Sequence, residues 1–523
     1  MKVLIIGNPS SGYIYSFIKY SLEKVNPSEI FLVDYLINSN PMCNRYAEYY
    51  AEAGVRVFTG CGKENLWKHI GEIYKILEAY GTFDVCHIHS LNEGSILLGK
   101  IVGKFCKRMI SNYWGSDWMR ADESIRFRQE ELLRISDYIV SDSKDICSQI
   151  NKFFLGEFDQ SVRFIRFKTP VIEEIRQGHV TEHEKRRFVE KYQIGCGKII
   201  LVCGYNGNPA HQHLAVFDAL EQLPDTVKAS IFIVIPATYG GTEQYICELN
   251  ERLKNSGIQS LVIKDYLSEL EVACLRSVTD IFINMQKTDA YSGTILEYTY
   301  LNKIVINGNW LNYSDLEKAG AFYKKVDKIE ELTSVIERTV TFFKEEQGKF
   351  SDNTQAVDSF QTPFERNELW KDLYQNQGDC SAYMKQQRAA VSARNTVYLN
   401  ELVKSYYMQK LLCMGDLAGK AKAWIEKNSF QSVTVYGAGH LGQVIYEQFR
   451  GSSLKSLSIA DKFVRHVEWY QPEVIGIEEM KGVPPDVVIV TPVQYMAEIK
   501  AELAPQFNSN VITLDEWISA IAM

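Results

Sequence analysis

The chain has 523 residues, enough for about three domains of ordinary size that each bury their own core. Hydrophobic residues make up 46% and charged residues 23%, a balance that indicates neither a disordered nor a membrane-spanning protein. The net charge of −8 argues against a general nucleic-acid binder, because phosphate contacts need a basic surface.

The first residues predict a buried strand and not a signal peptide, because the apolar run of MKVLIIGNPSSGY ends at Gly7 and Pro9. Eleven cysteines are scattered singly without a CxxC pair, which fits reduced thiols better than disulfides or a zinc site. We therefore expect a cytoplasmic protein. Basic and aromatic residues alternate at 104–108 and 163–168, where peripheral contact with the inner face of the cell membrane is expected.

Short apolar runs alternate with helical patterns along most of the chain, which predicts an α/β fold with parallel sheets. The strand pattern begins at VLII near the N-terminus, restarts at KIILVCG and restarts again at SVTVYG. We expect two tandem Rossmann-like domains over 1–178 and 179–345. A helical segment over 346–428 and a smaller Rossmann-like domain over 429–523 follow. Helices are expected at 242–256 and 268–278.

The most informative stretch runs from residue 280 to 308. An apolar strand leads into a polar loop, and Ser292 then offers a hydroxyl at the N-cap of a helix that begins with Gly293 and Thr294. The free N–H groups of such a helix start form an anion site, where a diphosphate fits. Asp289 and Glu297 are separated by seven residues, and Glu297 falls where a carboxylate could accept hydrogen bonds from a ribose. The pattern indicates a nucleotide-sugar donor, although a capping acid and a solvated glutamate would give the same spacing.

A glycine- and asparagine-rich loop follows the first strand of the second domain, in the segment LVCGYNGNPAHQHL. Gly204 and Gly207, on either side of Asn206, would let the backbone approach a phosphate. No arginine or lysine lies between residues 201 and 214. The charge of the diphosphate would therefore be neutralised by His213, by Lys287 or by helix N-termini. The histidine could instead be an ordinary surface residue at a helix start.

In the first domain, two residues at the ends of strands are candidates for catalysis. Asp117 follows the strand of SNYWGSDWMR, where it could take a proton from an acceptor hydroxyl or simply cap a helix. His89 ends the strand of VCHIHS and would lie near Asp117 in a parallel sheet, unless it is a buried structural histidine.

Two tandem α/β domains that end in the acid-seven-acid element resemble the GT-B class of glycosyltransferases over about residues 1–380. The resemblance implies that Glu297 holds the donor ribose and that Asp289, where glutamate is usual, lies near the transferred sugar. The segments LVCGYNGNPAHQHL and IPATYGGTEQYI, with residues 280–301, look like the TDP-N-acetylfucosamine:lipid II N-acetylfucosaminyltransferase family. That family acts in bacterial surface-glycan assembly.

The last domain contains GAGHLG directly after a strand, which matches GxGxxG at Gly437, Gly439 and Gly442. Asp461 follows about 20 residues later, after a second strand. The motif predicts a second nucleotide site, although about 95 residues are few for a complete dinucleotide fold. Small Rossmann units attached to bacterial polysaccharide enzymes look similar.

The sequence thus favours a glycosyltransferase of the hexosyl- or N-acetylaminodeoxyhexosyl-transfer type, with a hydroxyl acceptor on a lipid-linked glycan or a protein. We expect no required cofactor and no metal site, because a helix dipole and side chains can stabilise a departing diphosphate. Other expected partners are the membrane surface and a second copy of the chain. Two alternatives are a sugar-nucleotide oxidoreductase or epimerase that uses the GAGHLG module, and a non-catalytic glycosyltransferase-like partner subunit.

Overall fold

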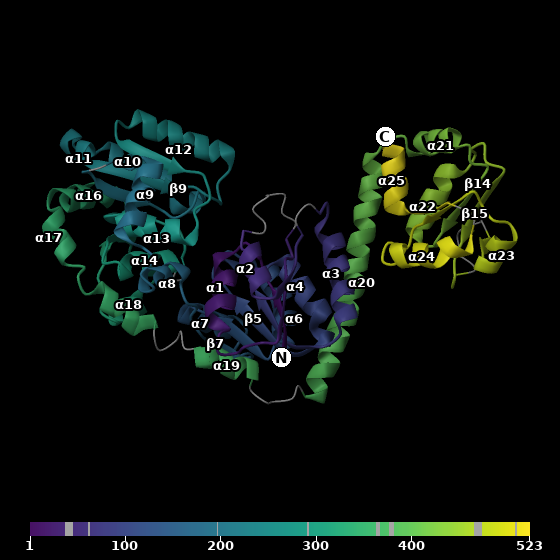
Figure 1. Cartoon of the computed structure of the whole chain (residues 1–523), viewed down its shortest axis with the longest axis horizontal. Helices are drawn as coiled ribbons and strands as arrows, with labels where there is room; N and C mark the ends of the chain where they lie inside the picture. The colour runs from purple at the N-terminus through teal and green to yellow at the C-terminus, as the bar shows by residue number, and fades with distance from the viewer. Residues whose placement is uncertain are drawn as a thin grey trace. The chain divides into compact units, whose positions relative to one another are not determined.

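The computed structural model describes residues 1–36, 45–60, 63–195, 197–289, 292–361, 367–375, 381–464, 473–507 and 510–522. The chain divides into two compact units (Figure 1). The first unit holds residues 1–61 and 81–388, and the second holds residues 62–80 and 389–523. Two parallel sheets lie in the first unit and a third lies in the second.

The first sheet has seven parallel strands in the order β3-β2-β1-β4-β5-β6-β7. The apolar side chains of the central strands β1, β4 and β5 are buried, as expected for parallel strands that helices cover on both faces. The direction of winding reverses between β1 and β4, which makes this the switch point of the sheet. The strands are β1 (Lys2–Ile6), β2 (Glu29–Val33), β3 (Val55–Phe58), β4 (Phe83–His89), β5 (Cys106–Tyr113), β6 (Tyr138–Ser141) and β7 (Val162–Phe164).

Helices of the first domain connect these strands, and several begin at side-chain caps. Asn92 starts α4 with a capping box, and the Asp122 and Ser143 side chains accept the N–H groups that open α6 and α7. The helices are α1 (Gly12–Ser16), which continues as a π-helix over Phe17–Ser21, α2 (Ala47–Glu52), α4 (Glu93–Val102), α5 (Ser116–Met119), α6 (Glu123–Arg134), α7 (Lys144–Phe153) and α8 (Pro170–Arg176).

The second sheet has six parallel strands in the order β10-β9-β8-β11-β12-β13, with its switch point between β8 and β11. The strands are β8 (Ile199–Cys203), β9 (Ile231–Pro236), β10 (Gln259–Ile263), β11 (Ile281–Asn284), β12 (Ile304–Gly308) and β13 (Lys324–Val326). β13 has only three residues, two of them lysines, so it carries no apolar run and could not be predicted from the sequence.

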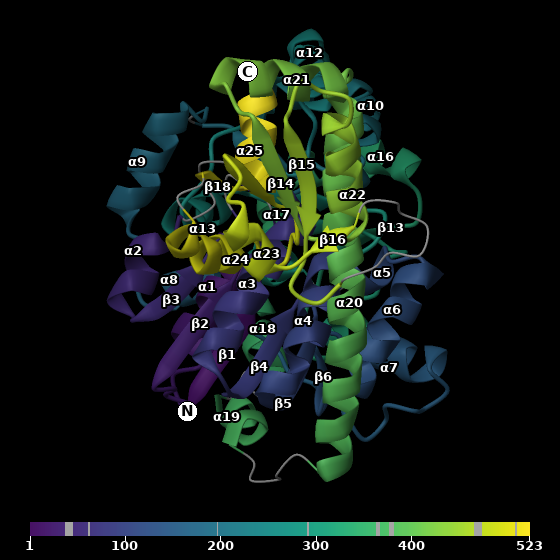
Figure 2. The same cartoon turned by 90° about the vertical axis from the view of Figure 1, so that its right-hand side faces the viewer.

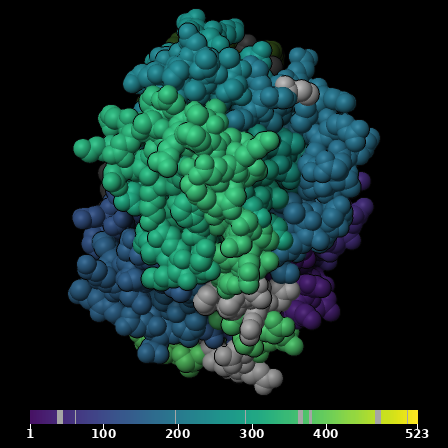
Figure 3. All heavy atoms as spheres, turned by 90° about the vertical axis from the view of Figure 1, so that its left-hand side faces the viewer, coloured from purple at the N-terminus to yellow at the C-terminus, as the bar shows by residue number. Residues whose placement is uncertain are grey.

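Helices α9 to α18 pack around this second sheet, and residues after β12, drawn in green, cover the middle of the face that Figure 3 shows. The expected helices at 242–256 and 268–278 are α12 and α13. The bounds are α9 (Glu182–Tyr192), α10 (His213–Glu221), α11 (Asp225–Ser230), α12 (Glu243–Asn255), α13 (Glu269–Val278), α14 (Gly293–Tyr300), α15 (Ser314–Lys318), α16 (Leu332–Thr341), α17 (Phe343–Gly348) and α18 (Asn353–Gln361).

The helical segment that follows returns to the first domain. In α19 (Asn367–Gln375), Trp370 is fully buried in the apolar core that also contains Val3 and Phe17. The Tyr374 hydroxyl lies 2.8 Å from Nδ1 of His87 in β4. The chain therefore crosses from the second domain back to the first within one unit.

The second unit contains the third sheet, with five parallel strands in the order β16-β15-β14-β17-β18 (Figure 2). The predicted class, α/β with three Rossmann-like sheets, is confirmed. The elements are α20 (Ala382–Cys413), within which the unit boundary falls, α21 (Leu417–Asn428), β14 (Ser432–Tyr436), α22 (His440–Phe449), β15 (Ser456–Ala460), β16 (Val474–Ile475), α23 (Ile477–Gly482), β17 (Val487–Val490), α24 (Met496–Leu503), β18 (Asn510–Thr513) and α25 (Leu514–Ala522).

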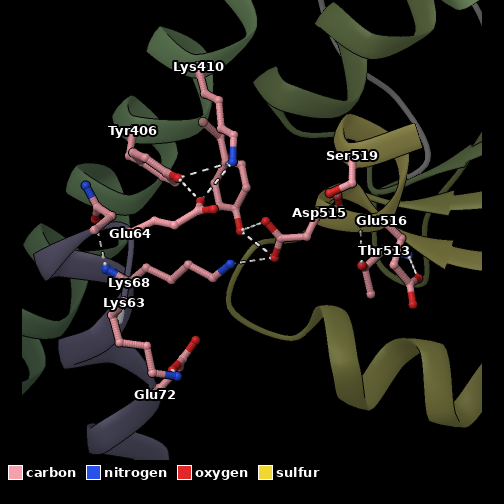
Figure 4. A network of polar contacts seen from close by, with 12 residues as sticks. Lys63, Glu64, Lys68, Glu72, Tyr406, Lys410, Thr513, Asp515, Glu516 and Ser519 are labelled. Atoms are coloured by element: carbon pink, nitrogen blue, oxygen red, sulfur yellow. Dashed lines mark hydrogen bonds and ion pairs between the residues drawn. The ribbon is translucent and has the colours of Figure 1, made fainter. Parts of the chain in front are cut away.

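Helix α3 (Leu66–Tyr80) belongs to this second unit, although it lies between β3 and β4 in sequence. Lys68 of α3 pairs with Asp515 at 2.7 Å, and the Tyr407 hydroxyl of α20 donates to the same carboxylate at 2.9 Å (Figure 4). Glu64, just before α3, accepts from Tyr406 and Lys410 of α20, both at 2.9 Å. Polar bonds thus join α3, α20 and α25.

Candidate functional site

A cleft with two adjoining compartments lies at the carboxyl ends of the first two sheets. The first compartment has a volume of about 470 Å³ and the second of about 420 Å³. Five residues line both compartments and therefore mark the boundary between them: Asn8, Ser11, Tyr13, Tyr205 and Tyr239. Doubly wound sheets bind ligands at their switch points, and the loops after β1, β4, β8 and β11 supply much of this lining.

Glu297 lies near the start of α14 and lines the first compartment. Its Oε2 accepts a hydrogen bond from Nε of Arg276 at 2.9 Å, and both side chains are buried. Arg276 also donates to the hydroxyls of Tyr298 at 3.1 Å and Thr294 at 3.4 Å, so the guanidinium is held by three groups. A Cβ on Gly293 would lie 3.5 Å from Oε1 of Glu297, an ordinary contact distance, so the glycine lies directly beside that oxygen.

A second cation lines the same compartment from the first domain. The Arg45 guanidinium pairs with Glu269 at 3.2 Å and lies 4.0 Å from the centre of the Tyr266 ring. The Tyr46 hydroxyl donates to the same carboxylate. Burial raises the pKa of Glu269, although Tyr46 and Arg45 oppose the shift. Neither Arg45 nor Arg276 was predicted from the sequence, because both lie outside the glycine-rich loop at 201–214.

Asp289 lines the second compartment, and its carboxylate accepts a hydrogen bond from the Tyr313 hydroxyl. Ser292 lines the same space and is the N-cap of α14, as expected, but its hydroxyl makes no capping hydrogen bond to the described residues. Asn206 also lines it, with Oδ1 bonded to the Asn208 N–H at 2.9 Å. The two acids of the motif therefore face different compartments. Ala290 and Tyr291, between them, lie outside the described residues.

The glycines of the loop after β8 serve the packing of the protein itself. Gly204 has φ +65°, and a Cβ there would lie 2.8 Å from Nε2 of His213. A Cβ on Gly207 would lie 3.3 Å from the backbone of Gly241 in the loop after β9. Neither glycine lines a compartment, so their contact with a phosphate stays a prediction.

The two expected cations of this region lie away from the cleft lining. His213 is fully buried, with Nδ1 3.2 Å from the Tyr245 hydroxyl, and burial lowers its pKa to about 4. Lys287 is exposed, and its backbone N–H donates to Ala210. A neutral imidazole supplies no charge near pH 7. Contact of either side chain with a donor stays a prediction.

The two candidates of the first domain differ in position. His89 ends β4, lines the second compartment and is 1% exposed, and burial lowers its pKa to about 3. Neither of its ring nitrogens has a hydrogen-bond partner among the described residues. Asp117 instead accepts the backbone N–H groups of Leu91 at 2.8 Å and Trp114 at 2.9 Å. Burial raises its pKa to about 6, and it is not among the residues that line the cleft. Its role as a base stays a prediction.

The third sheet has its own cavity of about 630 Å³ at the carboxyl ends of β14, β15 and β17. Gly437 has φ +109°, and a Cβ on Gly442 would lie 1.8 Å from the Gly437 carbonyl oxygen. A Cβ on Gly439 would meet nothing within 4 Å, so this glycine borders open space. Asp461 lines the cavity, and its carboxylate accepts the N–H of Ala438 at 3.0 Å. The motif lies between β14 and the first residues of α22, and its binding of a nucleotide stays a prediction.

Two further expectations concern metals and membranes. Within the described ranges, no group of three or more His, Cys, Asp or Glu side chains could hold a metal ion. No helix in those ranges is long and apolar enough to cross a membrane. In the basic segment at 104–108, Arg108 donates to the carbonyls of Leu373 and Tyr374, and Lys107 pairs with Asp84 at 2.7 Å.

No family model matches the chain, and no curated protein does either. Solved structures do match. A glycosyltransferase from Rickettsia africae is 13% identical with a TM-score of 0.52, over 72% of this chain and 98% of that one. Anabaena Alr3699/HepE, in complex with UDP and glucose, is 10% identical with a TM-score of 0.55, over 71% and 98%. WaaG, a glycosyltransferase of lipopolysaccharide biosynthesis, is 10% identical with a TM-score of 0.50, over 71% and 99%.

The matches cover about the same fraction of this chain as the residues of the first unit make up. Each match covers nearly the whole length of the neighbour. The likeness therefore extends over two complete domains and not over a single α/β layer. The first unit thus has the fold of GT-B glycosyltransferases.

Proposed function

We propose that the first unit transfers a sugar from a nucleoside diphosphate sugar to a hydroxyl acceptor. The observation that carries the proposal is the separation of Glu297 and Asp289 into adjoining compartments. The first compartment offers a fixed carboxylate to a ribose, and the second offers a carboxylate and aromatic walls to a sugar. A diphosphate at the start of α14 would lie between them.

The charge of the diphosphate has candidate partners in this arrangement. Arg276 and Arg45 both line the first compartment, one from each domain. Binding of a diphosphate would place negative charge beside two arginines whose present partners are carboxylates. We therefore propose that transfer requires no divalent metal, with the two arginines and the α14 N-terminus stabilising the leaving group. Undiminished turnover in EDTA is the expected result.

Donor binding tests the proposal directly. Titration calorimetry with UDP, dTDP, GDP and ADP and their glucose conjugates should identify one nucleotide that binds, and UDP is the first choice because HepE is known with it. Glu297→Gln should weaken that binding at least tenfold, measured at a temperature where the variant is folded, because the substitution also leaves Arg276 buried without its carboxylate and should lower the unfolding temperature. Glu317→Gln, an acid outside the cleft, is the control. Failure of all four nucleotides to bind would refute the proposal.

The second unit supports a separate proposal, a nucleotide or sugar-nucleotide site at Gly437, Gly439, Gly442 and Asp461. The observation in its favour is the open space over Gly439 within a cavity of about 630 Å³. A fluorescence titration measures whether NADH binds at this site, and assays with and without NAD(H) distinguish a glycosyltransferase from an oxidoreductase or epimerase. A glycosyltransferase should turn over without NAD(H). A protein that turns over only with NAD(H) would be an oxidoreductase or epimerase.

The finer parts of the proposal rest on the sequence alone. They are hexosyl or N-acetylaminodeoxyhexosyl transfer, a lipid-linked glycan or protein acceptor, a role in bacterial surface-glycan assembly, peripheral membrane contact and homo-oligomer formation. The domain boundaries 1–178, 179–345, 346–428 and 429–523 are likewise proposed, and each sheet falls inside one of them. A non-catalytic partner subunit is the alternative, and release of nucleotide from a donor sugar would refute it.

A further inference from the structure

We infer that Asp142 is the group that takes the proton from the acceptor hydroxyl, in place of Asp117. The inference rests on the proposed function, because it names the base of that reaction. Asp142 follows β6 directly and lines the second compartment, where His89 and Asp289 also lie. An acceptor in this compartment would therefore have a first-domain carboxylate beside the position proposed for the donor sugar.

The hydrogen bonds of the two aspartates separate their roles. Both carboxylate oxygens of Asp117 accept backbone N–H groups, from Leu91 and Trp114, and so hold the loops after β4 and β5 together. Oδ1 of Asp142 is buried and has no hydrogen-bond partner in the described part of the chain. A buried carboxylate oxygen without a partner is costly, so its persistence at a cleft is better explained by a ligand than by the fold.

Proton transfer needs a base that is ionised near neutral pH yet still takes up a proton readily. The pKa of Asp142 is raised to about 7, chiefly by burial; the Arg166 guanidinium opposes this shift, and the negative charges of Asp117 and Asp289 contribute to it. The charged and titratable groups that interact with Asp142 or line its compartment come from several other elements and loops. They are Tyr13, Tyr35, His89, Asp117, Arg120, Cys147, Arg166, Tyr205, His211, Tyr239 and Asp289.

His89 complements the carboxylate in the same compartment. Its imidazole is neutral near pH 7, because burial lowers its pKa to about 3. A neutral ring can accept a hydrogen bond at one nitrogen and donate at the other, and neither nitrogen is used by the described residues. His89 is thus suited to orient the acceptor hydroxyl while Asp142 takes its proton.

The proposed reaction is a single displacement at the anomeric carbon of the donor sugar. The acceptor oxygen attacks the anomeric carbon of the donor sugar, and the bond from that carbon to the diphosphate oxygen breaks. The electron pair of this bond leaves with the diphosphate, while the proton of the acceptor hydroxyl passes to Oδ1 of Asp142. The resulting carboxylic acid then releases its proton to water. Attack from the side opposite the diphosphate inverts the anomeric configuration.

The experiment uses the full chain, UDP-glucose or whichever donor the titration identifies, and water as the acceptor. Asp142→Asn should lower kcat for nucleotide release by about 10²- to 10⁴-fold while the donor Kd changes less than twofold. The wild-type profile of kcat/KM should rise with pH through an apparent pKa of about 7, and this limb should disappear in Asp142→Asn. Asp142→Glu should recover part of kcat. Asp159→Asn, an exposed acid of the same domain, is the control.

Loss of the charge should not unfold the protein, because burial already disfavours the ionised form of Asp142. Asp117→Asn, by contrast, should lower the unfolding temperature. Unchanged turnover in Asp142→Asn, a pH limb that survives the substitution, or a wild type that binds donor but never hydrolyses it would overturn the inference. If no nucleotide binds the wild type, the proposed function itself fails.

Discussion

Arg276 and Glu297 form a buried ion pair whose two members depend on each other. Taking either charge out of water is costly, and the cost is offset by the bond of 2.9 Å and the hydroxyls around the guanidinium. The intact pair therefore contributes little net free energy of folding, whereas removal of one partner alone would destabilise the protein strongly. What it provides is a carboxylate held in one orientation at the edge of the first compartment.

Arg276→Gln should destabilise the protein by about 3–5 kcal/mol, because it leaves Glu297 buried and unpaired. The double variant Arg276→Met with Glu297→Gln should recover most of that loss. Urea unfolding followed by circular dichroism measures both. If the single and double variants were equally unstable, the unpaired charge would not be the cause.

His213 predicts a specific pH effect on stability. Its pKa is about 4 in the folded protein and about 6.5 when unfolded, so the unfolded state binds more protons between these values. Stability should therefore fall as pH drops from about 6.5 to about 4, by up to about 1.4 kcal/mol per pH unit from this residue. His213→Gln should reduce the slope by that amount in denaturant titrations. An unchanged slope would show that the ring is protonated in the fold.

Helix α22 depends on glycine for its attachment to the third sheet. Gly442→Ala should destabilise the second unit, because its Cβ would lie 1.8 Å from the Gly437 carbonyl oxygen, which is backbone and cannot turn aside. Gly439→Ala is the matched variant, since its Cβ meets nothing within 4 Å and its φ of −70° suits alanine. Hydrogen exchange should therefore increase in α22 only for Gly442→Ala. Equal exchange in both variants would contradict this account.

The central elements of all three sheets could be predicted from the sequence, because buried parallel strands are continuous apolar runs. β16 could not, since a strand of two residues, Val474–Ile475, leaves no periodicity. At the cleft, Asp289 and Glu297 were found because their spacing is local. Arg45 and Asp142 were not predicted, because only the fold brings each of them to the cleft. Arg45 is 224 residues from its partner Glu269, and Asp142 has no motif around it in the sequence beyond the end of a strand.

At the scale of the whole molecule, the assignment of α3 to the second unit can be tested through Tyr407. Tyr407→Phe removes the hydroxyl that donates to Asp515. The ion pair of that carboxylate with Lys68 remains (Figure 4). Hydrogen exchange should rise in residues 66–80 and in α25. Lys63→Ala is the control, because its pair with Glu72 is exposed and such pairs contribute little. Faster exchange in the first sheet alone would argue against this assignment.

The placement of α3 also has a consequence for synthesis on the ribosome. Its buried side chains Ile70, Ile73 and Leu77 emerge about 300 residues before the segment that completes its unit. At about 5–20 residues per second, this interval lasts roughly 15–60 s. During that time an amphipathic helix waits without the rest of its unit while the first two sheets are made. In the newborn chain, the polar bonds that join α3 to α20 and α25 can therefore form only after the first two sheets are made.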